Sequence, residues 1–169
     1  AGVEALAPVL SNGSLPASLR AEAHALNGSL LGAQMGLDQA RGMTLGMTAQ
    51  QSTATSLRLA PDNPRVLFQS ATALINTPPE WGGDRAEAIR QLDRAVASFE
   101  PSAGLAPSWG EDEAHAWRGM AYLMDNDPVA ARPAIERAAE LNPASEFVQY
   151  KLMPWLQQVE QTSTESTDS

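Results

Sequence analysis

The sequence contains no cysteine and few basic or aromatic side chains. Its 169 residues include 11 Lys and Arg, Lys151 is the single lysine, and aromatic residues make up 5%. Without cysteine, the chain can form neither disulfides nor thiolate metal sites, and it has no Cys nucleophile. No apolar run approaches the roughly 20 residues that span a bilayer, so we expect no membrane insertion.

Acidic side chains outnumber basic ones, with 20 Asp and Glu against 11 Lys and Arg and a net charge of −9. Because phosphate binding depends on clustered Lys and Arg, this balance argues against a nucleic-acid partner. Residues 1–60 contain three acidic and three basic side chains, so the acidic excess lies from residue 61 onward. The N-terminal third is therefore the neutral part of an acidic chain.

Apolar residues recur at helical spacing between Pro and Gly, and no stretch alternates with a period of two. Asn63-Pro64 and Asp127-Pro128 each place a capping side chain before a proline at the first helical position. Pro154 should kink or end the last helix, because it lacks a backbone N–H. These patterns predict an all-α chain with helices near 2–10, 17–37, 43–59, 64–76, 84–99, 110–124, 128–141 and 145–158.

The segment 111–143 has an order of small and large residues that suits two antiparallel helices. The small residues would let the helices approach closely, while the bulky ones fill the space between them. These positions are Gly119, Tyr122, Ala131, Ile135, Ala138 and, ending the second helix, Pro143. This order resembles the tetratricopeptide repeat, a helix–turn–helix unit of about 34 residues. The family's leading Trp and Leu positions are occupied here by His115 and Arg118.

Two earlier segments resemble the same repeat. One carries Ala88, Leu92 and Ala95 in its second helix and has an insertion at 77–83, and the other places Thr53 at the position of Ile135. The resemblance implies a right-handed stack of about three helix–turn–helix repeats with a C-terminal capping helix. It would form one domain over residues 1–160, and the polar residues 161–169 should form a disordered tail.

Four short segments are similar to those of small, exported bacterial tetratricopeptide repeat proteins. They are Asn63-Pro-Arg65, Pro78-Pro-Glu-Trp-Gly-Gly83, Pro107-Ser-Trp-Gly110 and Leu141-Asn-Pro143. The small residue Ala1 would also fit cleavage by a signal peptidase. We therefore expect a periplasmic or secreted protein, and a cytoplasmic one if no such cleavage occurs.

The resemblance implies a non-catalytic scaffold or adaptor that holds a protein or peptide in a groove. The groove would present apolar side chains from the first helices of two repeats, namely Leu67, Ala71, Leu74, Ala116, Met120 and Leu123. An apolar groove suits an amphipathic or extended segment of a partner. The helix 145–158 could fill it instead, as could another copy of the chain in a homo-oligomer.

A metal or small-ligand binder is the alternative. Thioether and imidazole groups suit Cu(I), and the candidate ligands are His24, Met35, Met43 and Met47. Methionines four residues apart on a helix also serve simply to fill a core. We expect no other cofactor.

No catalytic motif is present, so we do not expect an enzyme. Glu111, Asp112 and Glu113 could orient His115 as a general base, but carboxylates are also ordinary in the first turn of a helix.

Two smaller features remain open. Trp81 and Trp109 lie beside glycines, where each could stack on a ligand or fix its loop. Gly28, Gly32 and Gly36, each four residues apart, predict a flat face for close helix packing.

Overall fold

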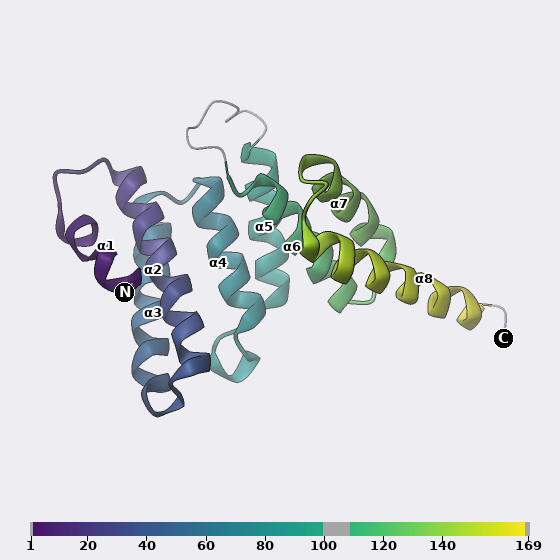
Figure 1. The fold of residues 1–169 in the computed structure, drawn as a ribbon, viewed down its shortest axis with the longest axis horizontal. Coiled ribbons are helices and arrows are strands. Elements are labelled where there is room, and N and C mark those ends of the chain that lie inside the picture. The colour runs from purple at the N-terminus through teal and green to yellow at the C-terminus, as the bar shows by residue number, and fades with distance from the viewer. Residues whose placement is uncertain (1, 100–108, 168–169) are drawn as a thin grey trace. The chain divides into compact units, whose positions relative to one another are not determined.

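The structure, a computed structural model, describes residues 2–99 and 109–167. Every regular element in these ranges is a helix, which confirms the predicted all-α class. The chain divides into two compact units, Ala1–Gly83 and Asp84–Ser169, where the sequence predicts one domain over residues 1–160. The two units are coloured purple to teal and teal to yellow in Figure 1.

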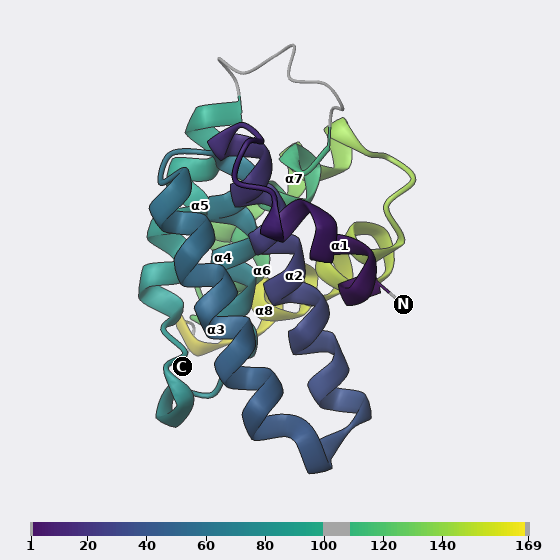
Figure 2. The same ribbon diagram turned by 90° about the vertical axis from the view of Figure 1, so that its left-hand side faces the viewer.

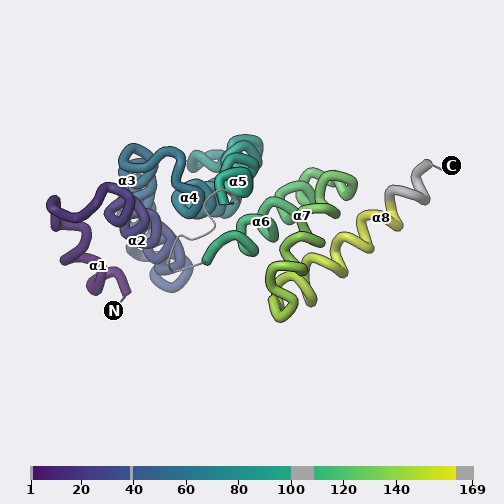
Figure 3. Tube along the Cα trace, turned by 90° about the horizontal axis from the view of Figure 1, so that it is seen from above, coloured from purple at the N-terminus to yellow at the C-terminus, as the bar shows by residue number. Residues whose placement is uncertain are grey.

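The first unit is built around a long antiparallel hairpin of α2 and α3 (Figure 2). The short helix α1 packs beside α2 (Figure 3), and α4 contacts both helices of the hairpin. The elements of this unit are α1 (Gly2–Ser11), α2 (Ala17–Leu37), η1 (Gln39–Arg41), α3 (Gly42–Leu59), α4 (Pro64–Asn76) and η2 (Pro79–Trp81).

The second unit contains a hairpin of α6 and α7, with α5 against α6 and the C-terminal helix against both. Its elements are α5 (Arg85–Phe99), α6 (Glu111–Met124), α7 (Pro128–Leu141), the π-helix η3 (Val148–Leu152) and α8 (Met153–Thr167). The α-helices α1 to α7 all begin and end within one residue of the predicted ranges.

The predicted helix caps are confirmed at α4 and α7. Asn63 Oδ1 accepts hydrogen bonds from the backbone N–H groups of Arg65 and Val66, at 2.9 and 3.3 Å. Asp127 Oδ1 accepts one from Ala130 N–H at 2.9 Å. Each side chain satisfies backbone donors that the first helical turn leaves without an intrahelical acceptor.

Pro154 widens the last helix without ending it. Since proline has no N–H, the carbonyl of Tyr150 cannot receive the usual hydrogen bond from four residues on. The preceding turn is a π-helix, Val148–Leu152, closed by a hydrogen bond from Met153 N–H to the Val148 carbonyl. The helix then continues to Thr167, so residues 161–167 are helical where the sequence predicts a disordered tail.

The core of the second unit confirms the small–large packing predicted for α6 and α7. Ala131, Ile135 and Ala138 are fully buried, and Tyr122 packs against the same cluster. A Cβ atom on Gly119 would lie 2.4 Å from Ile135 Cγ1, well inside van der Waals contact. Glycine at this position is therefore what lets α6 and α7 approach each other.

The same kind of contact joins α2 and α3 at one glycine. A Cβ atom on Gly28 would lie 2.7 Å from Thr53 Oγ1 and 3.2 Å from the Ala49 carbonyl. Gly32 and Gly36 have nothing within 4 Å of the corresponding position. The prediction of a flat glycine face is thus right for Gly28 and wrong for the other two, which lie beyond the close approach.

The glycines of α2 should therefore respond oppositely to alanine. Gly32→Ala is expected to raise the free energy of unfolding by about 1 kcal/mol, because alanine favours the helix and meets open space. Gly28→Ala should lower it by about 1 kcal/mol, since overpacking against Thr53 outweighs that gain. Urea denaturation of the two variants measures both changes, and equal signs would contradict the packing described here.

Candidate functional site

The most exposed methionines of the chain lie together on one side of α3. Met43 and Met47 are four residues apart, which places them on one helix face, and they are 71% and 68% exposed. Trp81 of the 77–83 loop is 59% exposed. We call Met43, Met47 and Trp81 the Met–Trp surface.

The loop that carries Trp81 is fixed to this face of α3. Gln50, one turn beyond Met47, donates from Nε2 to the Trp81 carbonyl at 3.0 Å. Trp81 and Gly83 both donate their backbone N–H to the Pro78 carbonyl, at 2.9 and 3.0 Å. The loop and the α2–α3 turn lie at the same end of the first unit (Figures 1 and 2). The backbone pins the loop and leaves the indole largely exposed.

Two glycines allow this loop to turn so tightly. Gly82 has φ +96°, a left-handed conformation that side chains rarely adopt. A Cβ atom on Gly83 would lie 1.7 Å from the Thr77 carbonyl oxygen, so no other residue fits there without moving the backbone. The conformations of Gly82 and Gly83 therefore fix the backbone position of Trp81.

The α2–α3 hairpin beside the Met–Trp surface carries few charges, whereas the loop places the exposed Glu80 next to Trp81. Between residues 23 and 57 the charged side chains are Asp38 and Arg41, which approach each other to 4.0 Å. His24 also lies in this stretch, and its pKa is lowered by desolvation and by the positive charges of Arg20 and Arg58. The lowered pKa disfavours the charged imidazolium, so this stretch carries one acidic and one basic side chain and no net charge.

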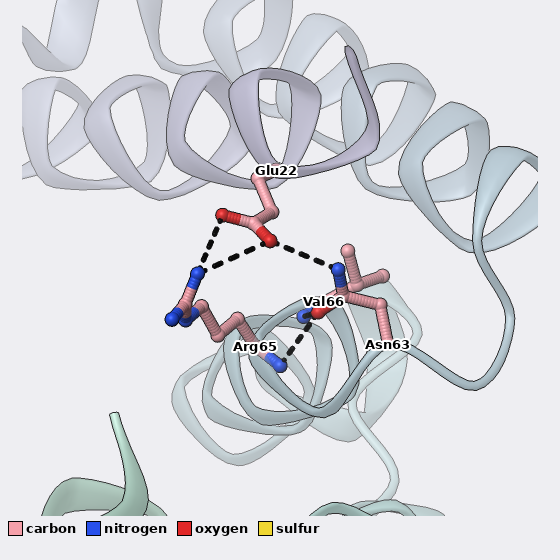
Figure 4. Close-up of polar contacts among 4 residues, drawn as sticks. All are labelled: Glu22, Asn63, Arg65 and Val66. Carbon is pink, nitrogen blue, oxygen red and sulfur yellow. Dashed lines mark hydrogen bonds and ion pairs between the residues drawn. The ribbon is translucent and has the colours of Figure 1, made fainter. Parts of the chain in front are cut away.

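Buried polar contacts hold α2 to its neighbours (Figure 4). Arg65 Nη1 donates to both carboxylate oxygens of Glu22, at 3.2 and 3.4 Å, and Asn63 Nδ2 donates to Glu22 Oε1 at 2.9 Å. Asn27 Nδ2 donates to Ser52 Oγ at 2.8 Å between α2 and α3. These contacts fix the hairpin whose outer face carries the two methionines.

Most of the groove residues predicted from the sequence are buried. Leu67 and Ala71 on α4 are buried and Leu74 is partly buried. On α6, Ala116 and Leu123 belong to a core that also contains residues of η3 and α8. Met120 packs against the edge of this core. The C-terminal helix thus covers this side of α6.

Among the predicted copper ligands His24, Met35, Met43 and Met47, the structure separates His24 from Met35. His24 and Met35 are eleven residues apart in the continuous helix α2, or about 16 Å at 1.5 Å per residue, too far to share one ion. Met35 packs against α3, with its Sδ 3.5 Å from the position of a Cβ on Gly46. Among the described residues, no three His, Asp or Glu side chains gather where they could hold a metal ion.

The carboxylates before His115 make contacts of their own. Asp112 accepts a hydrogen bond from Asn142 Nδ2 at 2.8 Å, and Glu111 approaches Arg137 to 3.7 Å. Desolvation alone would raise the pKa of Asp112, but hydrogen bonds from Glu113 and Asn142 lower it. Desolvation, the hydrogen bond with Asp112 and the charge of Asp112 raise the pKa of Glu113 to about 6.

Replacing Glu113 with glutamine is expected to raise the thermal midpoint near pH 7.5 and to leave it almost unchanged near pH 4. A pKa raised from 4.5 to about 6 means that the folded state favours the protonated carboxyl. That stabilisation is complete below the unfolded pKa and is lost as the pH rises through about 6, whereas glutamine keeps it throughout. An equal change in the midpoint at both pH values would contradict this assignment.

The other loop tryptophan, Trp109, is partly exposed and precedes Gly110, which has φ +97°. Residues 107 and 108 of the predicted Pro107–Gly110 segment lie outside the described residues.

None of the described helices is long and apolar enough to cross a bilayer. Comparisons with protein-family models, curated proteins and solved structures found no match.

Proposed function

We propose that this chain is a non-catalytic protein-binding module of the tetratricopeptide type, and that it contacts its partner through the Met–Trp surface. The exposed, uncharged triad of Met43, Met47 and Trp81 is the observation that carries this proposal. The partner would present an apolar face, such as one side of an amphipathic helix.

A matching pair of contacts in the two hairpins supports the repeat assignment. Gly28 meets Thr53 and the carbonyl of Ala49, four residues before Thr53. Gly119 meets Ile135 and the carbonyl of Ala131, again four residues earlier. Such agreement is expected if α2–α3 and α6–α7 are copies of one helix–turn–helix unit, the first with a longer turn.

The second helices of two proposed repeats agree in burial at three positions, and that of the third repeat agrees at one. Ala88, Leu92 and Ala95 on α5 are fully buried, as are their counterparts on α7. On α3, Ser56 stands at the position of Ala138 and is fully buried too. The second helices α5 and α7 therefore bury residues at the same spacing, and α3 shares the buried small residue at the third position, which supports a repeated packing unit.

The composition of the Met–Trp surface favours protein contact. Tryptophan and methionine are enriched in protein interfaces, whereas charged residues are depleted from interface centres. Methionine also adapts its shape to different apolar partners. In a chain with a net charge of −9, an uncharged apolar face is where an acidic or neutral partner meets least repulsion.

Site-specific photocrosslinking tests this proposal. A photoreactive phenylalanine at position 43 or 81 should crosslink the same partner in a native extract. The same photoreactive residue in place of Val129, which is 84% exposed on α7, should not crosslink this partner. Met43→Asp with Met47→Asp should abolish crosslinking from position 81 while leaving the far-UV circular dichroism unchanged. Equal crosslinking from position 129, or crosslinks that survive the double substitution, would refute the Met–Trp surface as the contact site.

A further inference from the structure

We propose that Met43 and Met47 form a paired oxidation site, at which a peroxide converts both thioethers to sulfoxides and so switches off the Met–Trp surface. The oxidation site stands on exposure and sequence alone, whereas the switch rests on the proposed function. Because the chain has no cysteine, the sulfur available to such oxidants is that of methionine.

The structure ranks the six methionines clearly. Met43 and Met47 are about 70% exposed, while Met35 and Met124 are 37% and 38% exposed. The remaining two, Met120 and Met153, pack against the core of the second unit. Since methionine oxidation follows the accessibility of the sulfur, an oxidant should reach the pair on α3 first.

The reaction balances with hydrogen peroxide as the oxidant. A lone pair on Sδ attacks one peroxide oxygen, the O–O bond breaks, and an S–O bond forms. The second oxygen leaves as water with both peroxide protons. Sulfur loses two electrons and peroxide gains two. Methionine sulfoxide reductases return the sulfoxide to the thioether, so the change is reversible.

Oxidation here alters the surface without disturbing the core. Neither side chain of the pair is buried, so two polar sulfoxides can be accommodated in water on the outer face of α3. Each sulfoxide would bring a strong polar group into an apolar interface, so oxidation should weaken the binding of the partner. The i, i+4 spacing means that one turn of helix loses both apolar side chains together.

Peptide mapping after peroxide treatment of the folded chain tests the site. Trypsin cleaves after Arg and Lys, so the peptide 42–58 contains Met43 and Met47 and no other methionine. Met35 lies on the peptide 21–41, and Met153 lies on the peptide 152–169. The peptide 42–58 should gain oxygen on the order of tenfold faster than 152–169. Equal rates for these two peptides would overturn the site.

Retention of the folded protein on a phenyl matrix tests the switch. Peroxide should shorten the retention of the native chain but not that of Met43→Leu with Met47→Leu, which keeps the apolar surface without the thioethers. A Met35→Leu variant, as the control, should respond like the native chain. Unchanged native retention after full oxidation of 42–58 would overturn the switch. Failure of the crosslinking test with rapid oxidation of 42–58 would instead remove the proposed function and leave the oxidation site intact.

Discussion

Replacing Glu22 with leucine is expected to lower the free energy of unfolding by about 3 kcal/mol. The substitution removes the carboxylate that faces Arg65, whose side chain is 5% exposed. Breaking a buried ion pair by removing one partner costs roughly 3–5 kcal/mol, because a charge loses its counter-charge inside the protein. We expect the lower end of this range, since the Glu22 side chain is itself 23% exposed. Urea denaturation of the full chain measures the change.

A double-substitution cycle provides the control. Glu22→Leu combined with Arg65→Met replaces the pair with apolar side chains, which is often close to neutral in stability. The double variant should therefore be more stable than Glu22→Leu alone. Additive losses would show that the ion pair does not hold α2 to α4, and that the two side chains act only through separate packing.

Gly119→Ala should lower the free energy of unfolding by about 2 kcal/mol, even though alanine is the better helix former. The added Cβ would lie 2.4 Å from Ile135 Cγ1, and the Ala131 carbonyl at 3.4 Å borders the same position. Neither helix can move away without opening the core formed around Ile135, which is fully buried. The clash therefore outweighs the gain of about 1 kcal/mol in helix propensity.

Ile135→Ala supplies the matched background for this prediction. That substitution alone should cost about 2–5 kcal/mol through lost burial and the cavity it leaves. It also removes the atom that a Cβ on Gly119 would meet, so Gly119→Ala should be neutral or stabilising in the Ile135→Ala background. If Gly119→Ala destabilises both backgrounds equally, the contact between Gly119 and Ile135 is not the cause.

Local signals in the sequence sufficed to predict the helices. Capping side chains and prolines act on the first turn of a helix, so Asn63-Pro64 and Asp127-Pro128 place α4 and α7 without reference to the rest of the chain. The small–large order around Gly119 and Ile135 also predicted their contact, because two helices approach closely only where one of them lacks a side chain. The π-helix before Pro154 needed the structure, because loss of a donor allows either an end to the helix or a wider turn.

The candidate site was harder to predict. Helical spacing showed that Met43 and Met47 share a face, but spacing is the same for a core stripe and an exposed one. Their exposure follows from where α2 and α4 pack on α3. The link between Gln50 and the Trp81 carbonyl joins residues 31 positions apart, and no local pattern marks it.

By itself, the sequence determined the all-α class, the ends of the helices α1 to α7, the caps and the neutral character of the N-terminal third. These depend on backbone hydrogen bonding, side-chain shape and charge within one or two turns. Only the tertiary structure decided which apolar side chains are buried and which remain exposed. It buried Leu67 and Ala116, which the groove prediction had placed at a binding surface, and left Met43 and Trp81 in water. Burial depends on which distant segment packs against a helix face, and that packing is determined by residues far apart in the chain.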